Sequence, residues 1–235
     1  MRNAVVLLSG GLDSSTTLAI VKERGYVPYC ISFCYGQKQV VELEVAKKIK
    51  TLIAPEAEHK IINIDLKTFG HSAITDDIEI PKGRTEKEIS SNIPITYVPA
   101  RNTIFLSYAL AYAEVIPAND IFIGANVLDY SGYPDCRPAY IEAFNTMANL
   151  ALAKAVQGEK ITIHTPLLQL NKSQIIEEGI RLGVDYSHTI SCYNPTVDGV
   201  SCGQCDACIL RLNGFKNLGK EDPAKYIDTK NTNKK

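Results

Sequence analysis

A glycine-containing loop between an apolar run and a helical pattern is the feature that most constrains the fold of this chain. Residues 9–16 read SGGLDSST, after the apolar residues 4–8 and before the helical pattern of residues 17–24. A strand, a glycine loop and a helix in this order leave unpaired backbone N–H groups at the end of a buried strand. The pattern therefore predicts a loop that binds phosphate.

The residue types in this loop favour a nucleotide bound together with a metal ion. Gly10 and Gly11 allow positive φ and let the backbone approach the anion closely. Asp13 would repel phosphate unless Mg²⁺ lies between them, so it indicates a magnesium-bridged nucleotide. The lysine of a Walker loop is absent, which argues against transfer of a γ-phosphate. The alternative interpretation is a plain Ser/Gly-rich turn after an edge strand.

Length and charge narrow the class of function. The 235 residues suit one large domain, which can bury a full core without disulfides. With 25 basic and 26 acidic residues the net charge is −1, which favours small-molecule substrates and offers no general attraction for nucleic acid. We expect no membrane contact and a cytoplasmic location, because the chain shows neither a span-length apolar run nor a secretory signal pattern.

Apolar segments alternate with helical patterns along the chain. Runs rich in β-branched residues fall at residues 4–8, 27–33, 60–64, 120–123 and 160–163, and helical patterns at 40–53, 103–116 and 140–156. This alternation predicts the α/β class with a doubly wound parallel sheet. Ligands of such sheets bind beyond the carboxyl ends of strands, so the first loop is the expected site. Residues 75–99, rich in proline and charge, are expected to form either a long surface loop that acts as a lid or a solvated linker.

Four of the seven cysteines lie near the C-terminus with the spacing of metal ligands. They form the pattern C-x9-C-x2-C-x2-C at Cys192, Cys202, Cys205 and Cys208. Four thiolates leave no open position on zinc, so a zinc ion here would be structural. An iron–sulfur cluster is the competing interpretation. We expect a nucleotide-binding α/β domain at residues 1–185, a zinc-binding segment at 186–220 that packs on it, and a tail at 221–235.

Motifs along the whole chain resemble one protein family. SGGxDS in the first loop resembles the signature of the PP-loop ATP pyrophosphatases, which have an adenine nucleotide alpha hydrolase-like fold. The chain as a whole resembles the QueC family of queuosine biosynthesis proteins. The segments that carry this resemblance are SGGLDSSTTL at 9–18, FCYGQ at 33–37, VPARNTIFLS at 98–107, GANVLDYSGYPDCR at 124–137, HTPLLQLNKSQII at 164–176, SCYN at 191–194 and CGQCDACILRLNGF at 202–215.

The resemblance implies an ATP-dependent ligase that forms carbon–nitrogen bonds. Such an enzyme converts 7-carboxy-7-deazaguanine and ammonia to 7-cyano-7-deazaguanine through adenylated carboxylate and amide intermediates, in queuosine precursor synthesis. It also implies Mg²⁺ with the ATP, one structural Zn²⁺ per subunit and a homodimer. The ATP-binding residues that it implies are Leu8, Ser9, Gly10, Gly11, Leu12, Asp13, Ser14, Ser15, Thr16, Thr17 and Leu18.

Two further segments are expected to bind the substrates. Arg101 and Asn102 open a helix, where a cation suits the phosphates or the substrate carboxylate, although Arg101 is alternatively a surface charge. Asp129 follows the fourth predicted strand and is a second carboxylate near Mg²⁺, a partner of a substrate nitrogen, or a turn cap. The loop after it is expected to stack on the deazaguanine and to hydrogen-bond it, through Tyr130, Tyr133, Asp135 and Arg137. Packing roles are the alternative for the two tyrosines.

Other PP-loop enzymes and other classes of protein fit this sequence less well. A tRNA thiolase would need a basic surface for RNA, which the balanced charge does not provide. A zinc-dependent binding module would leave the nucleotide loop unexplained. Family members commonly carry a basic residue and a histidine after YGQ, whereas here Lys38 is followed by Gln39, which puts a catalytic histidine there in doubt. Cys136 is expected to be structural, because the reaction needs no thioester.

Overall fold

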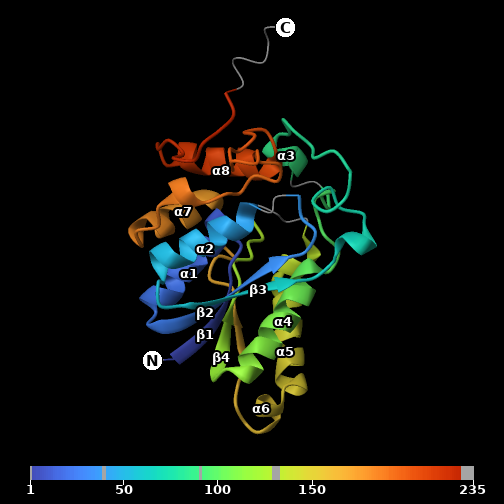
Figure 1. The fold of residues 1–235 in the computed structure, drawn as a ribbon, viewed down its shortest axis with the longest axis vertical. Helices are drawn as coiled ribbons and strands as arrows, with labels where there is room; N and C mark the ends of the chain where they lie inside the picture. Colours follow the sequence, from blue (N-terminus) through green and yellow to red (C-terminus); the bar gives the residue numbers. More distant parts are fainter. Residues whose placement is uncertain (1, 39–40, 90–91, 129–132, 229–235) are drawn as a thin grey trace.

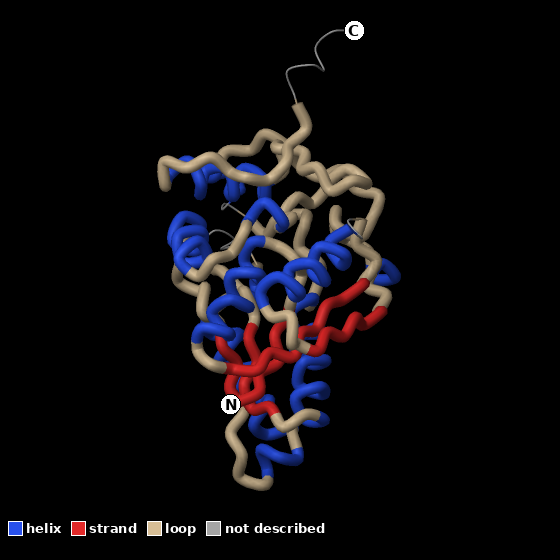
Figure 2. The backbone as a smooth tube through the Cα atoms, turned by 60° about the vertical axis from the view of Figure 1, so that its left-hand side comes forward, coloured by secondary structure: helices blue, strands red, loops and turns tan. Residues whose placement is uncertain are grey.

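A five-stranded parallel sheet in the order β3-β2-β1-β4-β5 forms the centre of the protein. The computed structural model describes residues 2–38, 41–89, 92–128 and 133–228. Figure 2 shows the strands as one band with helices on both sides, which confirms the expected doubly wound α/β sheet. The strands are β1 (Arg2–Leu7), β2 (Tyr26–Cys34), β3 (Glu58–Asn63), β4 (Ala118–Phe122) and β5 (Thr162–His164).

Successive residues of the central strand β1 face two different helical layers (Figure 1). Ala4 and Val6 pack with α1 (Leu12–Glu23) and α2 (Val41–Ile53). Val5 and Leu7 pack with α4 (Arg101–Val115) and α5 (Pro138–Ala151) on the other side. Burial on both faces explains why this strand is continuously apolar rather than alternating. The chain leaves β1 and β4 toward opposite layers, which opens a crevice between their carboxyl ends.

The helix after the first loop begins earlier than its sequence pattern predicts. Helix α1 begins at Leu12 rather than at residue 17. The hydroxyls of Ser15, Thr16 and Thr17 donate to the carbonyls of Gly11, Leu12 and Asp13, within the helix. A run of hydroxyl residues favours a loop by propensity, but here these side chains are satisfied in a helical conformation.

The single helix expected at residues 140–156 is divided into α5 and α6 (Ala153–Val156). Leu152 separates them with an extended backbone, at φ −88° and ψ 138°. The first turn of α6 is held against the C-terminal end of α4, because the Lys154 N–H donates to Glu114 Oε1 over 3.1 Å. The buried Lys154 ammonium also donates to the carbonyls of Ala113 and Ala118. These tertiary bonds end the longer helix that periodicity alone predicts.

The C-terminal part packs across the carboxyl ends of the strands, where Figure 1 shows α8 (Asp206–Asn217) beside α3 (Glu86–Ile89). The segment expected to be a loop or lid at 75–99 is attached to it: the Gly83 N–H donates to the Gln204 carbonyl at 2.9 Å, and Arg84 pairs with Asp206. Helix α7 (Lys172–Arg181) joins α1 and α8 through a shared apolar cluster and begins with a capping box. Short 3₁₀ turns lie at Lys67–Phe69, Pro134–Cys136 and Tyr186–His188.

The tail is anchored as far as the structure describes it. Arg211 is buried and its Nε lies 2.8 Å from Oδ2 of Asp222. The Ser201 N–H donates to the Lys225 carbonyl over 2.9 Å. Among the described residues, none of the helices combines the length and the apolar character that a membrane crossing requires.

Candidate active site and metal centre

A cavity of about 250 Å³ lies at the crevice between the carboxyl ends of β1 and β4. Residues that follow both strands line it, among them Leu8 after β1 and Ile123 after β4. The cavity thus lies where the topology of a parallel sheet predicts a ligand site. The residues of the expected ATP loop that line the cavity are Leu8, Ser9, Gly11, Leu12, Asp13 and Ser14.

The N-terminus of α1 faces this cavity. Gly11 is the N-cap residue, and its missing side chain supplies no cap to the first turn. The next three residues, Leu12 to Ser14, line the cavity as well. The first N–H groups of a helix and the positive end of its dipole attract anions. The start of α1 can therefore attract an anion into the cavity.

The two glycines of the loop have different roles. Gly10 has φ +81° and Gly11 has φ −76°, so only the first of the two glycines uses the positive φ that both allow. A Cβ on Gly10 would lie 2.7 Å from the Ala46 nitrogen in α2. The Gly10 carbonyl also accepts the Ile190 N–H at 3.2 Å, which joins the loop to the segment before Cys192.

We expect Gly10→Ala to lower the melting temperature clearly more than Gly25→Ala. Both glycines have positive φ, at +81° and +76°, but the region around Gly25 is open within 4 Å. Backbone strain alone costs about 1–2 kcal/mol, and only Gly10→Ala adds a clash with backbone atoms. Thermal unfolding of the two variants measures the difference. Equal melting temperatures would show that the close approach of Gly10 to α2 does not contribute to the free energy of unfolding.

The remaining residues of the expected ATP loop lie outside the cavity lining. The hydroxyls of Ser15 and Thr17 are engaged with carbonyls of the first helical turn. Thr16 Oγ1 lies 2.7 Å from the hydroxyl of Tyr186, in the buried contact with the C-terminal part. Leu18 belongs to the core between the sheet and α2. These four residues stabilise the start of α1 on the side away from the cavity.

An ion pair between α1 and α7 lies in the cavity wall. Lys172 Nζ is 2.8 and 3.0 Å from the two carboxylate oxygens of Asp13. The Lys172 side chain is only 10% exposed and the Asp13 side chain 26%, so the pair is held largely out of solvent. Sequence reasoning missed Lys172, although it belongs to the quoted motif LNKSQ. Lys172 could have been found from the sequence, because it is a cation at the first position of a capped helix that follows a strand of the sheet.

Arg101 brings a second cation to the cavity from the N-terminus of α4. Burial disfavours the charge on this guanidinium, but the nearby Tyr35, Tyr133 and Asp135 groups favour it and leave its pKa raised. The residue before it, Ala100, has φ +54°, a left-handed conformation that is uncommon for alanine. Sites of this kind of strain cluster at ligand-binding positions. The structure therefore supports the site role of Arg101 over that of a surface charge.

Asn102 and Asp135 connect α4 to the turn that carries Tyr133. Asp135 Oδ2 accepts the Asn102 N–H at 3.0 Å, and Asn102 Nδ2 lies 3.3 Å from Cys136 Sγ. Asn102, Tyr133 and Cys136 line the cavity, whereas Asp135 is buried outside its lining. Burial raises the pKa of Cys136 to about 11, so this thiol stays protonated at neutral pH.

Three of the other expected substrate residues are not placed in the cavity. Arg137 is exposed at the N-cap of α5 and is not part of the lining. Asp129 and Tyr130 lie outside the described residues. Tyr133 is buried and lines the cavity, and its hydroxyl lies 3.0 Å from Thr96 Oγ1. Tyr193, from the cysteine segment, also lines the cavity and was not singled out in the sequence.

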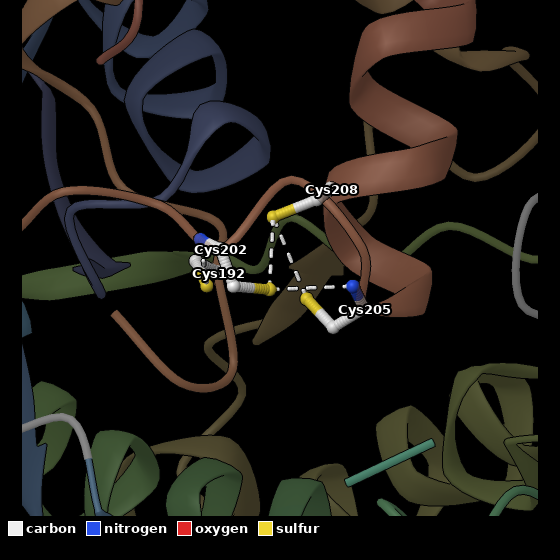
Figure 3. A group of neighbouring side chains, drawn as sticks. All are labelled: Cys192, Cys202, Cys205 and Cys208. Carbon is white, nitrogen blue, oxygen red and sulfur yellow. Dashed lines mark hydrogen bonds between the residues drawn. The ribbon is translucent and has the colours of Figure 1, made fainter. Parts of the chain in front are cut away.

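The four C-terminal cysteines converge at one buried point (Figure 3). Their sulfur atoms all lie within 4.8 Å of one another. The Sγ atoms of Cys205 and Cys208 are 3.5 Å apart, and those of Cys202 and Cys208 are 4.0 Å apart. Four sulfurs around a tetrahedral zinc ion, each at about 2.3 Å, are separated by about 3.8 Å. The group can therefore hold a metal ion of this size.

The environment of the sulfurs also suits a cation. Backbone N–H groups of Asn194 and Cys202 donate to Cys192 Sγ at 3.4 and 3.2 Å, which favours a thiolate. Interactions with the neighbouring thiols, chiefly Cys192, raise the pKa of Cys205 and Cys208, and burial adds to this effect. Four thiolates in one buried group repel each other unless a cation lies between them. The cluster thus has the donor set and geometry of a closed metal site.

Comparison with known proteins assigns the chain to a family. A family model described as "Queuosine biosynthesis protein QueC" matches residues 3–219. The chain belongs to the QueC family. Among curated relatives, the 7-cyano-7-deazaguanine synthase of Kineococcus radiotolerans is 58% identical over 96% of this chain and 98% of its own. The protein of the same name from Desulfatibacillum aliphaticivorans is 59% identical over 95% of this chain and 96% of its own.

A solved structure resembles the fold of this QueC family member. A 4-thiouridine synthetase, solved as an RNA complex with bound ATP, matches with a TM-score of 0.51 and 17% identity. The match covers 96% of this chain and 47% of that one. At this identity the likeness concerns the fold alone.

Proposed function

We propose that this QueC family protein converts 7-carboxy-7-deazaguanine and ammonia to 7-cyano-7-deazaguanine, with one ATP consumed in each of two steps. The observation that carries the proposal is the identity of 58% over nearly the full length to a relative named for this product. The cavity supports it, because a helix N-terminus and two cations, Arg101 and Lys172, line one space at the switch point of the sheet. Such a space suits an anionic nucleotide beside an anionic acid.

The chemistry requires activation of a poor electrophile. Attack of the substrate carboxylate on the α-phosphorus of ATP expels pyrophosphate and gives an acyl adenylate, from which ammonia displaces AMP. The amide oxygen then attacks a second ATP in the same way, and loss of AMP and a proton leaves the nitrile. In both steps negative charge develops on the departing pyrophosphate, and cations or helix N–H groups placed there lower the barrier.

Each lining residue has a defined part in this scheme. The N–H groups of Gly11 to Ser14 bind pyrophosphate oxygens at the start of α1. Asp13 faces Mg²⁺, which would neutralise the phosphates when bound. Lys172 holds the Asp13 carboxylate in place and supplies positive charge beside the leaving group. Arg101 orients the substrate carboxylate or a phosphate.

The metal and the assembly complete the proposal. We assign Zn²⁺ to the four cysteines, as a structural ion, because four thiolates are its common closed ligand set. An iron–sulfur cluster would make the protein brown when purified without oxygen, whereas a zinc protein is colourless. The active form is a homodimer in the cytoplasm.

Incubation of the purified chain with ATP, Mg²⁺, the acid and ammonium tests the function directly. We expect AMP, pyrophosphate and the nitrile to accumulate, with the amide as an intermediate, as detected by mass spectrometry. Omission of ammonium should abolish the nitrile. A reaction that yields neither AMP nor nitrile under these conditions would reject the proposal.

A further inference from the structure

Tyr193 brings an aromatic ring from the cysteine segment into the wall of the cavity. It lines the same space as Arg101 and the start of α1. Its hydroxyl lies 3.4 Å from the hydroxyl of Tyr133, whose ring centroid is 5.9 Å from that of Tyr97. Tyr133 and Tyr193, from distant parts of the chain, therefore bring two aromatic side chains to one side of the cavity, and Tyr97 packs behind Tyr133. Neither the expected ligand set nor the expected substrate loop included this residue.

The backbone around Tyr193 is fixed by the sulfur of its neighbour. The Asn194 N–H and the Cys202 N–H both donate to Cys192 Sγ. Tyr193 lies between Cys192 and Asn194 in the sequence, so the hydrogen bond from the Asn194 N–H to Cys192 Sγ spans it and closes a turn of the backbone at Tyr193. Its ring packs half-buried against the main core and against the cysteine cluster. The direction of the ring consequently depends on where Cys192 is held.

We propose that Tyr193 is a specificity-determining residue whose ring packs on the flat heterocycle of the acid substrate. This inference rests on the proposed function. The phosphate end of the nucleotide is taken by the start of α1, while Arg101 and Asn102 lie with Tyr133 and Tyr193 in the lining. Aromatic faces beside a cation match a planar heteroaromatic carboxylate, which needs stacking for its ring and a charge for its carboxylate. The backbone turn at Cys192 to Asn194 then positions the Tyr193 ring for recognition of the substrate.

Calorimetric titration of the full-length protein tests the inference, with 7-carboxy-7-deazaguanine added in the presence of a non-hydrolysable ATP analogue. Loss of a stacked ring should weaken binding of the acid by about tenfold or more in Tyr193→Ala. Tyr193→Phe keeps the ring and should stay within about threefold of the unchanged protein. Affinity for the ATP analogue and zinc content should be preserved in both variants, and the melting temperature should fall only in Tyr193→Ala, which loses the packing of the half-buried ring.

Val197→Ala is the matched control, because Val197 lies in the same loop and is 96% exposed. Its affinity for the acid should equal that of the unchanged protein. Tyr193→Ala with unchanged acid affinity, or with an equal loss for the ATP analogue, would overturn the inference. Failure of the unchanged protein to bind the acid at all would overturn the proposed function instead, so the two failures are distinguishable.

Discussion

Lys172→Met is expected to lower the rate of pyrophosphate release by about a hundredfold or more. Methionine keeps the length and the apolar stem of lysine but removes the cation 2.8 Å from Asp13. The cavity then loses positive charge where the leaving group becomes more negative, and Asp13 loses its partner. Release of pyrophosphate measured in the first turnover reports this step directly. We expect the melting temperature to fall as well, because Asp13 is left without its cation in a largely buried position.

Arg181→Met is the matched control for this variant. Arg181 lies on the same helix and, like Lys172, connects α7 to α1, through Glu23. Its side chain is 53% exposed and lies outside the cavity lining, so its loss should leave the rate within about twofold. A Lys172→Met protein as fast as Arg181→Met would contradict the assigned role of the ion pair.

Asp13 and Lys172 should also behave as one unit. Asp13→Ala is expected to abolish turnover while the zinc content stays unchanged, because the two sites are separate. The combined variant should be no slower than the slower single variant, since residues that act together have non-additive effects. A combined variant whose loss of rate equals the product of the two single losses would instead indicate independent roles of Asp13 and Lys172. Loss of zinc in Asp13→Ala would contradict the separation of the two sites.

The second large effect is expected from Cys208→Ser. Removal of one of four thiolates should reduce the bound zinc from about one ion per chain to a small fraction, because a structural site contributes its binding energy to folding. The cysteines form an apolar cluster with Ala73, Ile80 and Ile190, so the segment around residues 73–84 should also loosen. Metal analysis, thermal unfolding and limited proteolysis of that segment measure the three effects.

Cys34→Ser serves as the control for cysteine chemistry. Cys34 is a free, half-buried thiol at the end of β2, away from the cluster. Its replacement should leave zinc content unchanged. Retention of full zinc content by Cys208→Ser would show that the ion does not require four thiolates.

The sequence predicted the sheet well because buried parallel strands are continuously apolar. All five expected apolar runs overlap strands of the structure, and the cysteine spacing identified the four residues that converge and can hold a metal ion. Regular local patterns carry this information. The start of α1 and the division at Leu152 were missed, because particular side-chain hydrogen bonds decide both. Hydroxyl groups bond to carbonyls within α1, and the backbone of Lys154 bonds to Glu114 of α4.

The candidate site was predicted in part. Arg101 and the loop residues Leu8, Ser9 and Gly11 to Ser14 line the cavity, and each of them follows or opens a recognisable element. Lys172 and Tyr193 were missed because their roles depend on partners far away in the sequence, at Asp13 and Tyr133. Arg137 carries a suitable charge but lies at an exposed helix start. Residue type and motif do not report which side of a loop faces a cavity.

The hydrogen bond from the Ile190 N–H to the Gly10 carbonyl connects the first loop to the segment that carries the four cysteines. Energetic coupling between binding sites is reciprocal. If the ion held by the cysteines raises the affinity of the loop for a nucleotide through this bond, the nucleotide must raise the affinity of the cysteines for the ion by the same factor. Cells short of zinc would then lose this protein more slowly when ATP is plentiful.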